Sequence, residues 1–499
     1  MDVNETKIQN ENHSEKNKLN NREEICIDDI KGSTFSVDDA VEKAGYGRFQ
    51  IRLLCLAGLG WFADAAEIFI LSVIGDFLSC DWELQRWQLA MLTSLVFAGT
   101  MIGSPAFGTL ADKYGRKRSL SVATPLLFVF GALSAASPSY VWLVVFRFLM
   151  GFALGGMTQG LTLCSEYCPT KMRGRAGFYL CYFWSFGTIS VVLLSWVVME
   201  FLSNWRILLA ITSLPAFIVV ISLKWYPESS RYYVVSNQHE KAIKILDKMA
   251  KCNNTVAPPG ELEELKETAV RGRLQDLLNQ KLRKTTLIFW YIWFATAFAY
   301  YGIALLTPII IQKGGLTTNE NSASSIVNGT DDVTMSKIIP CTKLTRQNYI
   351  DLLWTSSAEF PGLVLFTFLV ECCSRKLLLG GACAFSGVMI FLLLLKTKKI
   401  IILVFLFGAR SILLSVFQLI LIMTSEVFPT TVRALAMGTG SAFARLGGLI
   451  VPYIAQVMII SQPLATICVL AGVTIICAVA AAFIPETKGE RLKETIELT

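Results

Sequence analysis

Apolar residues fall into twelve separate segments along the chain, and polar residues lie between them. Each segment is close to or above the roughly 20 residues that an α-helix needs to cross about 30 Å of hydrocarbon. This pattern predicts an all-α integral membrane protein with twelve transmembrane helices. The segments are 51–77, 87–109, 119–137, 140–164, 176–199, 206–225, 286–312, 350–370, 377–395, 400–423, 434–460 and 463–484.

The polar stretches divide these helices into two sets of six. Residues 226–285 alternate charged and apolar positions, which predicts short amphipathic helices at the cytoplasmic surface. Residues 1–50 are polar, so we expect a disordered cytoplasmic tail without a cleavable signal. The predicted organisation is a tail (1–50), an N-terminal six-helix half (51–225), a cytoplasmic loop (226–285), a C-terminal six-helix half (286–484, with a long outer loop at 313–349) and a second cytoplasmic tail (485–499).

Composition narrows the class of protein further. Of the 499 residues, 53% are hydrophobic and 17% are charged, whereas soluble domains average about 25% charged. This argues against a soluble enzyme, a disulfide-stapled secreted domain and a disordered chain. The net charge of +7 is scattered, so nucleic acid is not an expected partner. Because the sequence has no Walker A pattern and no metal-binding spacing, we expect no cofactor, no metal and no enzymatic activity.

Lysine and arginine are unequally shared between the two sets of short loops. Loops 2–3, 4–5, 8–9 and 10–11 carry ten of them, and the opposite short loops carry five. The positive-inside rule therefore predicts that both chain ends are cytoplasmic. The long outer loop contains Asn328 in an Asn-Gly-Thr glycosylation acceptor. Cys80 and Cys341 lie in outer loops, where a bridge between them is one alternative and two free thiols are the favoured one.

Three signatures occur twice, separated by 258, 259 or 260 residues. Chance similarity would not keep this register, so the chain is predicted to consist of two homologous six-helix halves. Such repeats are typical of secondary transporters, which bind substrate between the halves near the middle of the membrane. The repeated pairs are 112–117 with 371–376, 166–173 with 426–433, and 227–229 with 485–487.

These segments resemble the sugar-porter-type signatures of the major facilitator superfamily, and the resemblance covers about residues 50–490. The similar segments are 108–118 between helices 2 and 3, 147–156 in helix 4, and 227–231 and 485–489 after helices 6 and 12. Three further segments resemble the synaptic-vesicle-glycoprotein-related (SVOP-like) branch, which lies near the organic ion transporters. They are 61–67, 299–302 and 353–362.

The resemblance implies a charged network that braces the cytoplasmic side of the two bundles in the outward-facing state. The alternative is that these charges only anchor loops at the lipid headgroups. Ser374 stands where the first copy has Gly115, so we expect strain in that turn and a weaker latch between helices 8 and 9. The residues assigned to the network are Asp112, Gly115, Arg116, Lys117, Arg147, Glu166, Arg173, Glu371, Arg375, Arg410, Glu426 and Arg433.

Ionisable residues inside the predicted spans are costly and usually functional. Asp64 and Glu67 are three positions apart and share a helix face. Two carboxylates this close in a low dielectric resist being ionised together, so one can hold a proton near neutral pH, or the pair can bind a cation. The alternative is a structural ion pair, for instance with Arg147. The full set is Asp64, Glu67, Arg147, Glu359, Arg410 and Arg445.

Glu359 is followed by Pro361 and Gly362, which weaken the helix at the charge, as in helices that line cavities. Contact with substrate or a proton, and pairing between helices, are both open for it. Tyr300, Tyr301 and Trp354 are candidates for an aromatic lining that attracts organic cations, although rings in membrane helices more often pack or face lipid.

The leading hypothesis is a secondary active transporter of an organic ion or small organic solute that works by alternating access. Its expected partners are a small-molecule substrate, a coupling proton and the lipid bilayer, and no oligomer is implied. The alternative is a non-transporting vesicle receptor, sensor or scaffold with the same fold. The branch resemblance implies a synaptic vesicle or the plasma membrane as its location.

Overall fold

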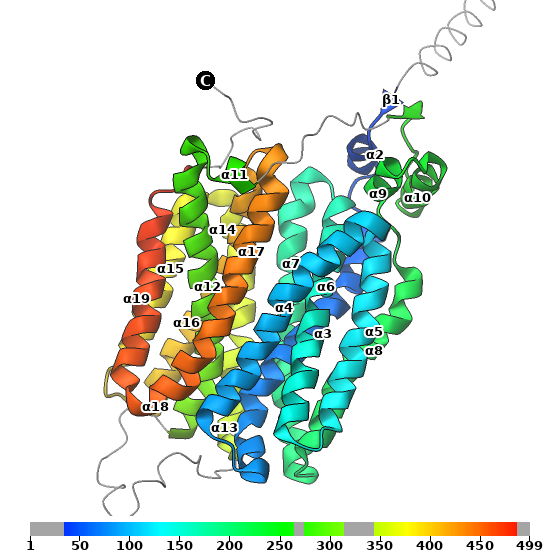
Figure 1. Ribbon diagram of the computed structural model, residues 1–499. Coiled ribbons are helices and arrows are strands. Elements are labelled where there is room, and N and C mark those ends of the chain that lie inside the picture. Colours follow the sequence, from blue (N-terminus) through cyan, green and yellow to red (C-terminus); the bar gives the residue numbers. More distant parts are fainter. Residues whose placement is uncertain (1–33, 264–273, 314–343, 487–499) are drawn as a thin grey trace, which may run out of the picture.

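The computed structural model describes residues 34–263, 274–313 and 344–486. Within these ranges, twelve helices are long and apolar enough to cross a membrane, which confirms the predicted all-α membrane fold (Figure 1). The N-terminal half contains α3 (Arg48–Trp82), α4 (Arg86–Tyr114), α5 (Arg116–Ala135), α6 (Tyr140–Glu166), α7 (Thr170–Phe201), α8 (Trp205–Ser222) and the 3₁₀ turn η1 (Leu223–Trp225). The C-terminal half contains α11 (Leu274–Leu277), α12 (Gln280–Lys313), α13 (Arg346–Ser357), α14 (Glu359–Cys372), α15 (Arg375–Leu392), α16 (Lys399–Val427), α17 (Thr430–Pro452), the π-helix η4 (Tyr453–Met458), α18 (Ile459–Ser461) and α19 (Pro463–Ala481).

The two halves stand side by side as bundles of near-parallel helices (Figure 1). They meet where α4 packs on α17, α3 on α12, and α7 on α13, α14 and α16. The described chain begins and ends at the end of the bundle that carries α2 and α10, which we call the α10 end. The opposite end, where α13 begins, is called the α13 end.

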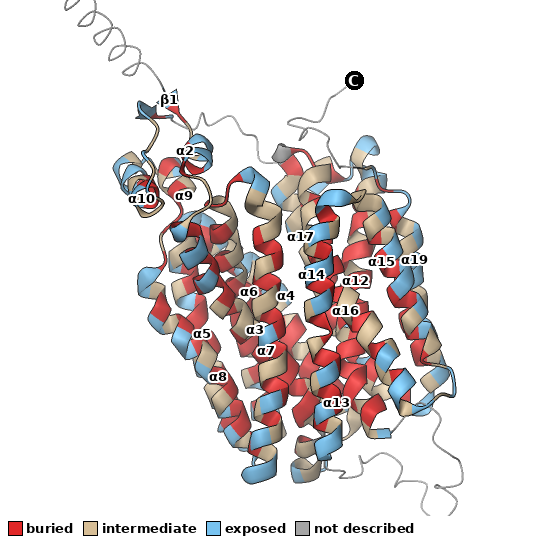
Figure 2. Cartoon of the chain, turned by 180° about the vertical axis from the view of Figure 1, so that it is seen from behind, coloured by how far each residue is buried: buried red, intermediate tan, exposed pale blue. Residues whose placement is uncertain are grey.

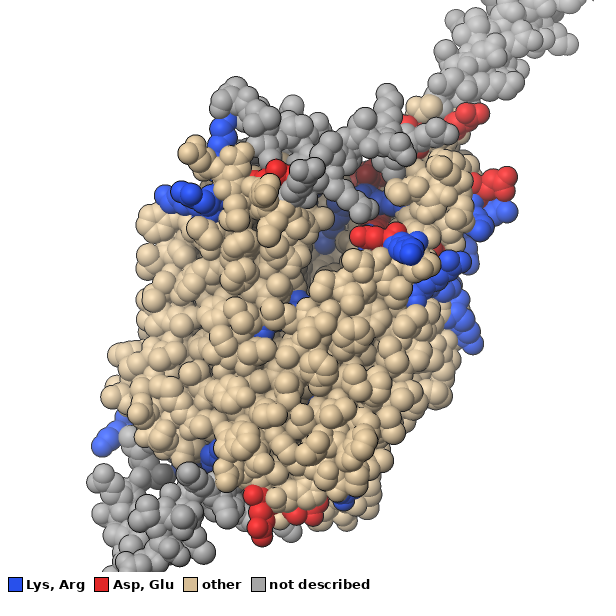
Figure 3. Space-filling model, viewed as in Figure 1, with Lys and Arg blue, Asp and Glu red and all other residues tan. Residues whose placement is uncertain are grey.

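Buried side chains line the inside of both halves, and exposed ones face outward (Figure 2). The exposed outer side chains include large apolar ones such as Phe186, Phe201 and Phe368. Charged residues gather at the two ends and leave a mostly uncharged band between them (Figure 3). This band is the surface that the hydrocarbon of a bilayer would cover.

Glycine lets α4 and α6 approach each other backbone to backbone. A Cβ atom on Gly151 would collide with the carbonyl oxygen of Val96, and one on Gly155 would collide with the backbone nitrogen of Ser104. Close contacts of this kind stabilise helix pairs in membranes through van der Waals packing. Gly151 and Gly155, which belong to segment 147–156 in the fourth span, therefore let α6 pack directly against α4.

The eighth span is interrupted immediately before Glu359, where α13 ends and α14 begins. Pro361 has no N–H to donate to the carbonyl of Ser357, so the regular helical hydrogen bond is missing at this turn. Gly362 lies against α16, and a Cβ atom there would collide with the carbonyl oxygen of Ser411. The weak helix predicted from Pro361 and Gly362 thus lets α14 lie close to α16.

Replacing Gly362 with alanine is expected to destabilise the protein by about 2 kcal/mol, because two backbones would have to separate. Thermal unfolding of the purified protein measures this. Gly381→Ala on α15 is the matched control, since nothing lies within 4 Å of its Cβ position. Equal melting of the two variants would contradict the packing described here.

The prediction that residues 1–50 are disordered is wrong for residues 34–50. Strand β1 (Thr34–Phe35) pairs in parallel with β2 (Glu261–Leu262), and helix α2 (Val37–Ala44) follows it. A capping box between Ser36 and Asp39 starts α2, a local signal that a hydropathy pattern does not contain. Residues 1–33 lie outside the described chain.

Two short helices in the loop between the halves hold this N-terminal segment. They are α9 (Ser230–Val235) and α10 (His239–Cys252), and α10 buries one face against the protein. Asn253 joins the parts: its Oδ1 accepts from the N–H of Phe49 at 3.0 Å, and its Nδ2 donates to the carbonyl of Ala44 at 3.1 Å. The loop therefore fixes the start of α3.

Candidate functional site

Glu67 and Arg147 form an ion pair inside the N-terminal half. Arg147 Nη1 donates to Glu67 Oε2 at 2.9 Å and to the Glu67 backbone oxygen at 3.3 Å, and both side chains are fully buried. The structure thus corrects the grouping of Arg147 with the cytoplasmic network. It also gives Glu67 the partner named above as the structural alternative. Neither charge would be tolerated here alone, because an unpaired buried ion costs several kcal/mol.

Glu359 lies between the halves and receives hydrogen bonds from both. From the C-terminal half, Arg410 Nε donates to Oε1 at 3.0 Å and the hydroxyl of Tyr300 donates to Oε1 at 3.1 Å. From the N-terminal half, Ser185 Oγ donates to Oε2 at 2.8 Å and Thr188 Oγ1 at 3.5 Å. Four donors therefore replace the water that a fully buried carboxylate has lost. Arg410 belongs to this group, not to the cytoplasmic network with which it was predicted.

Aromatic rings from both halves continue the group around Glu359. The indole N–H of Trp184 donates to the hydroxyl of Tyr300 at 2.6 Å. The ring of Phe69 lies 6.1 Å from that of Trp184, 5.9 Å from Tyr300 and 6.4 Å from Tyr301, between centroids. The guanidinium of Arg410 lies 5.6 Å from the centre of the Phe69 ring. Tyr300 and Tyr301 are thus together at the centre of the molecule.

Trp354 is not part of this aromatic group. Its side chain is 56% exposed, and it stacks on Phe407 with the ring centroids 5.1 Å apart. The structure therefore places Trp354 on the outer face of the bundle. This agrees with the alternative that aromatic residues of membrane helices face lipid. A hydropathy pattern gives no helix rotation, so this distinction was beyond the sequence.

Asp64 and Arg445 face the interface from opposite halves. Asp64 lies on α3 and Arg445 on α17, and they interact electrostatically with each other and with Tyr301. No ion pair within 4 Å joins them among the residues that the structure describes. Asp64 Oδ1 and Arg445 Nε are buried and have no hydrogen-bond partner, while Arg445 Nη1 donates to the carbonyl of Ser441 at 2.9 Å. Asp64 and Glu67 therefore have different surroundings, although they share a helix face.

The first copy of the predicted charged network is assembled at the α10 end. Arg116 Nη1 lies 2.8 Å from Asp112 Oδ1, and Arg116 Nε lies 3.5 Å from Glu166 Oε1. Arg173 Nη2 lies 3.9 Å from Asp38 Oδ1 in α2. The first two contacts link α4, α5 and α6 to one another, and the third links α7 to the N-terminal segment.

Glu228, which the site prediction did not include, caps the N-terminus of α5. Its Oε1 accepts from the N–H of Lys117 at 2.9 Å, so the main chain of Lys117 makes this contact. Gly115 has a φ of +106°, and a Cβ atom there would collide with the Glu228 carboxylate. A carboxylate at a helix N-terminus is stabilised by the unpaired N–H groups and the helix dipole. The turn therefore requires glycine at 115.

The second copy repeats this cap with Glu486 at the N-terminus of α15. Glu486 Oε1 accepts from the N–H of Arg375 at 3.0 Å, and the Ser374 hydroxyl donates to Glu486 Oε2. Ser374 has a φ of −60°, and its side chain accepts from the N–H of Leu377. The expected strain at Ser374 is therefore wrong: the turn adopts an ordinary backbone conformation and gains a side-chain cap.

The charged members of the second copy make three separate contacts. Arg375 Nε lies 3.6 Å from Glu426 Oε2 within the C-terminal half. Glu371 instead pairs with Arg175 of α7, which crosses from one half to the other at the α10 end. Arg433 Nε donates to the carbonyl of Phe428 at 3.2 Å. Arg175 was absent from the predicted network, and its ion pair with Glu371 connects the halves at this end.

A cleft of about 610 Å³ lies beside the Arg175–Glu371 pair. The surface is hollowed between the halves at this end (Figure 3). Glu42 of α2 lies on its rim and accepts from the N–H of Thr170 at 2.6 Å. The hydrogen bonds from Thr170 hold the pKa of Glu42 below its ordinary value. The N-terminal segment therefore borders the opening at the α10 end.

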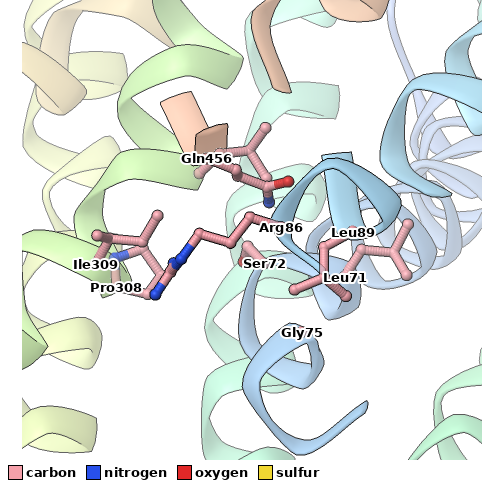
Figure 4. Close-up of a pocket in the computed structure, with 9 residues that line it drawn as sticks. Leu71, Ser72, Gly75, Arg86, Leu89, Pro308, Ile309 and Gln456 are labelled. Atoms are coloured by element: carbon pink, nitrogen blue, oxygen red, sulfur yellow. The ribbon is translucent and has the colours of Figure 1, made fainter. Parts of the chain in front are cut away.

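At the α13 end the halves are in close contact. Ser94 Oγ donates to the carbonyl of Leu449 at 2.7 Å, and the rings of Trp196 and Tyr349 lie nearly parallel with centroids 6.3 Å apart. Only about 30 Å³ of space is left in the nearby pocket between Arg86 and Pro308 (Figure 4). The two halves are therefore packed against each other at these points of the α13 end.

The sequence predicted the state of two outer-loop cysteines and a glycosylation candidate. Cys80 is disulfide-bonded, so the favoured free thiol is wrong for this residue. Cys341 and the glycosylation candidate Asn328 lie outside the described residues.

Comparisons with known proteins place these features in a wider context. The family model for sugar (and other) transporters matches residues 36–338 and 354–498. Synaptic vesicle 2-related proteins of Xenopus laevis and Rattus norvegicus are 41% and 40% identical over 463 residues, which is 93% of this chain and 83% of each relative. The xylose transporter XylE from E. coli, in a partially occluded inward-open conformation, aligns with a TM-score of 0.67 over 89% of this chain and 99% of that one. At 18% identity, this last similarity is one of fold.

Proposed function

Since the chain belongs to the sugar (and other) transporter family, we propose that it is a secondary active transporter that moves an organic ion or another small organic solute by alternating access. In this mechanism the two halves rock around a central site that opens to one side of the membrane at a time. The helices at the α13 end are in contact and a cleft is present at the α10 end, which is the arrangement that such a cycle requires in one of its states.

The observation that carries the proposal is the position of Glu359. Its carboxylate binds Arg410 in its own half and Ser185 in the other half, inside the protein. A purely structural ion pair needs no donors from a second rigid body. Hydrogen bonds that cross the interface must break when the halves rock, so this group is suited to sense the conformation and the bound solute.

We assign the coupling proton to Asp64. Arg147 compensates Glu67, and Arg410 compensates Glu359, at contacts of about 3 Å. The Asp64 carboxylate has an oxygen without a partner and no cation within 4 Å in the described chain. Binding a proton is the simplest way to neutralise such a carboxylate in the membrane.

The α10 end is assigned to the cytoplasm, together with both chain ends, because the positively charged short loops lie there. The names of the relatives support a synaptic vesicle as the location.

The function is tested by reconstituting the purified protein in liposomes and measuring uptake of labelled organic cations, anions and neutral solutes, with and without a pH gradient. Uptake of one of these classes supports the proposal. A folded, monodisperse protein that takes up no solute under any gradient would instead favour the receptor or scaffold function.

Asp64→Asn is expected to abolish the response to the pH gradient while leaving some uptake. The ratio of steady-state solute accumulation with and without a one-unit pH gradient should fall from about ten, the limit that one coupled proton sets at about 1.36 kcal/mol per pH unit, to about one. Asp81→Asn is the matched control: it is the same change on the same helix, in a residue that accepts from Trp205 Nε1 at 3.0 Å near the α13 end. An unchanged ratio in Asp64→Asn would show that Asp64 does not carry the coupling proton. The transporter proposal itself would not be affected.

A further inference from the structure

Helix α10 carries a row of lysines on one face. Its opposite face is apolar and buried against the protein. The lysines are three or four positions apart, so they lie within about 80° of one another around the helix axis. All of them are exposed: Lys241, Lys244, Lys248 and Lys251. The two acidic residues of the helix, Glu240 and Asp247, lie to one side of this row.

Contacts of α9 place the lysine row beside the ends of α4 and α5. The Tyr232 hydroxyl donates to the carbonyl oxygen of Lys113 at 3.3 Å. Lys241 Nζ lies 5.8 Å from the centre of the Tyr233 ring, and Tyr233 also interacts electrostatically with Arg118. Basic side chains gather at this edge of the molecule, beneath the position of α10 (Figure 3). We call the following exposed residues the basic patch: Lys113, Arg118, Lys241, Lys244, Lys248 and Lys251.

The protein does not compensate the charge of the basic patch. Among the residues that the structure describes, no carboxylate oxygen lies within 4 Å of the charged nitrogens of these six side chains. Arginines nearer the middle of the same end are paired, Arg116 with Asp112 and Arg175 with Glu371. The positive charge of the patch is therefore directed outward and available to a partner.

Helix α5 shows the depth at which the patch meets a membrane. Val122 and Val129 follow Arg118 by four and eleven positions, so these exposed apolar side chains share its helix face and belong to the uncharged band. Arg118 lies about 6 Å beyond Val122 along the helix axis, and the headgroup layer of a bilayer is about 5–7 Å thick. The exposed Trp225, with Lys224 Nζ 4.2 Å from the centre of its ring, is typical of this boundary. The patch therefore lies at the level of the lipid headgroups.

We propose that the basic patch binds the negatively charged headgroups of the leaflet at the α10 end, and that this lipid surface anchors α10. Lysines close to an anionic leaflet are attracted to it over about one Debye length, and their apolar stems pack along the adjoining surface. Asn253, just after α10, accepts from the N–H of Phe49 and donates to the carbonyl of Ala44. The anchor therefore extends to the start of α3. This inference is independent of the transported solute.

Acylation of lysine amines, followed residue by residue with mass spectrometry, tests the proposal on the full chain. The protein is placed in nanodiscs of phosphatidylcholine alone or of phosphatidylcholine with phosphatidylserine. An anionic headgroup stabilises the protonated amine, which does not react. We expect the α10 lysines to react at least about tenfold more slowly in the phosphatidylserine nanodiscs, and high salt to remove most of this difference.

Lys396 and Lys398 are the internal control. They are exposed near the α13 end, and both leaflets of a nanodisc contain the same lipids. They therefore experience the charge of the membrane without the geometry of the patch, and their rates should change no more than about twofold. Inorganic phosphate added to the phosphatidylcholine nanodiscs should leave the α10 lysines as reactive as before.

A variant gives a second measurement. Replacing Lys244 and Lys248 together with glutamine should lower the number of phosphatidylserine molecules that the protein retains in native mass spectrometry. The matched control is Lys396→Gln with Lys398→Gln, which should retain as many as the parent protein. The acylation rates of the wild-type protein are decisive by themselves if a variant fails to fold.

Three results would overturn the proposal. Equal reactivity of the α10 lysines in the two kinds of nanodisc would show that they do not bind anionic lipid. An equal slowing of Lys396 and Lys398 would show a general effect of surface charge. Slowing by inorganic phosphate alone would assign the patch to a soluble anion instead of a lipid surface.

Discussion

Arg147→Met is expected to destabilise the protein by about 3–5 kcal/mol, the cost of leaving one member of a buried ion pair without its partner. Glu67 would keep its charge in a site from which water is excluded, and Arg147 Nη1 supplies its two hydrogen bonds there. Methionine fills most of the volume of the arginine stem, so the effect reports the charge and not a large cavity. Reversible unfolding in mixed detergent micelles measures it.

A second substitution distinguishes a charge effect from a packing effect. Adding Glu67→Gln to Arg147→Met removes the stranded carboxylate and should restore most of the lost stability. Arg206→Met is the control, because the Arg206 side chain is 40% exposed and its ion pair with Asp81 should contribute little. If Arg147→Met unfolds under the same conditions as the parent protein, the pair does not support the N-terminal half.

Glu359→Gln is expected to lower the initial rate of solute uptake by about a hundredfold, which corresponds to about 2.7 kcal/mol of activation free energy. The amide keeps the size of the side chain but removes the charge that compensates Arg410 and accepts from Tyr300. The halves then lose the carboxylate that both of them bind. The rate is measured in liposomes with a solute that the wild-type protein takes up.

Two variants show how much a hydrogen bond to Glu359 from the other half and one from its own half contribute to uptake. Ser185→Ala and Tyr300→Phe each remove one donor to Glu359 and should lower uptake about tenfold, since a hydrogen bond to a charged group is worth about 1.5–3 kcal/mol. Glu240→Gln on the surface of α10 should leave uptake unchanged. Wild-type uptake in a folded Glu359→Gln variant would show that the group around Glu359 only holds the helices together.

The twelve transmembrane helices could be predicted because the hydropathy of a segment follows from its amino-acid sequence alone. The partner of each buried charge could not be predicted, because it depends on how the helices are rotated and packed. From the sequence, Glu67 could interact with Asp64 on its own helix or with Arg147 on another helix. The family resemblance assigned Arg147 and Arg410 to the cytoplasmic network, although both are in predicted spans, and the structure pairs them with Glu67 and Glu359 instead.

Local chemistry explains the other differences. Ser374 avoids strain because its own side chain caps α15, which a comparison with Gly115 alone did not show. Glu228 and Glu486 had a signal in the sequence, since the Pro-Glu pair occurs once in each half. Ser185 and Thr188 had none, because hydroxyl side chains are common in membrane helices and usually bond to their own backbone.

The hydrogen bonds from Ser185 and Thr188 to Glu359 have a kinetic consequence for the transport cycle. If the empty carrier changes sides, both donors leave the carboxylate before anything replaces them, and a lost donor costs about 1–3 kcal/mol. A bound solute that supplies polar groups lowers that cost. Return of the unloaded carrier should then be the slow step, so exchange of solute across the membrane should be faster than net accumulation.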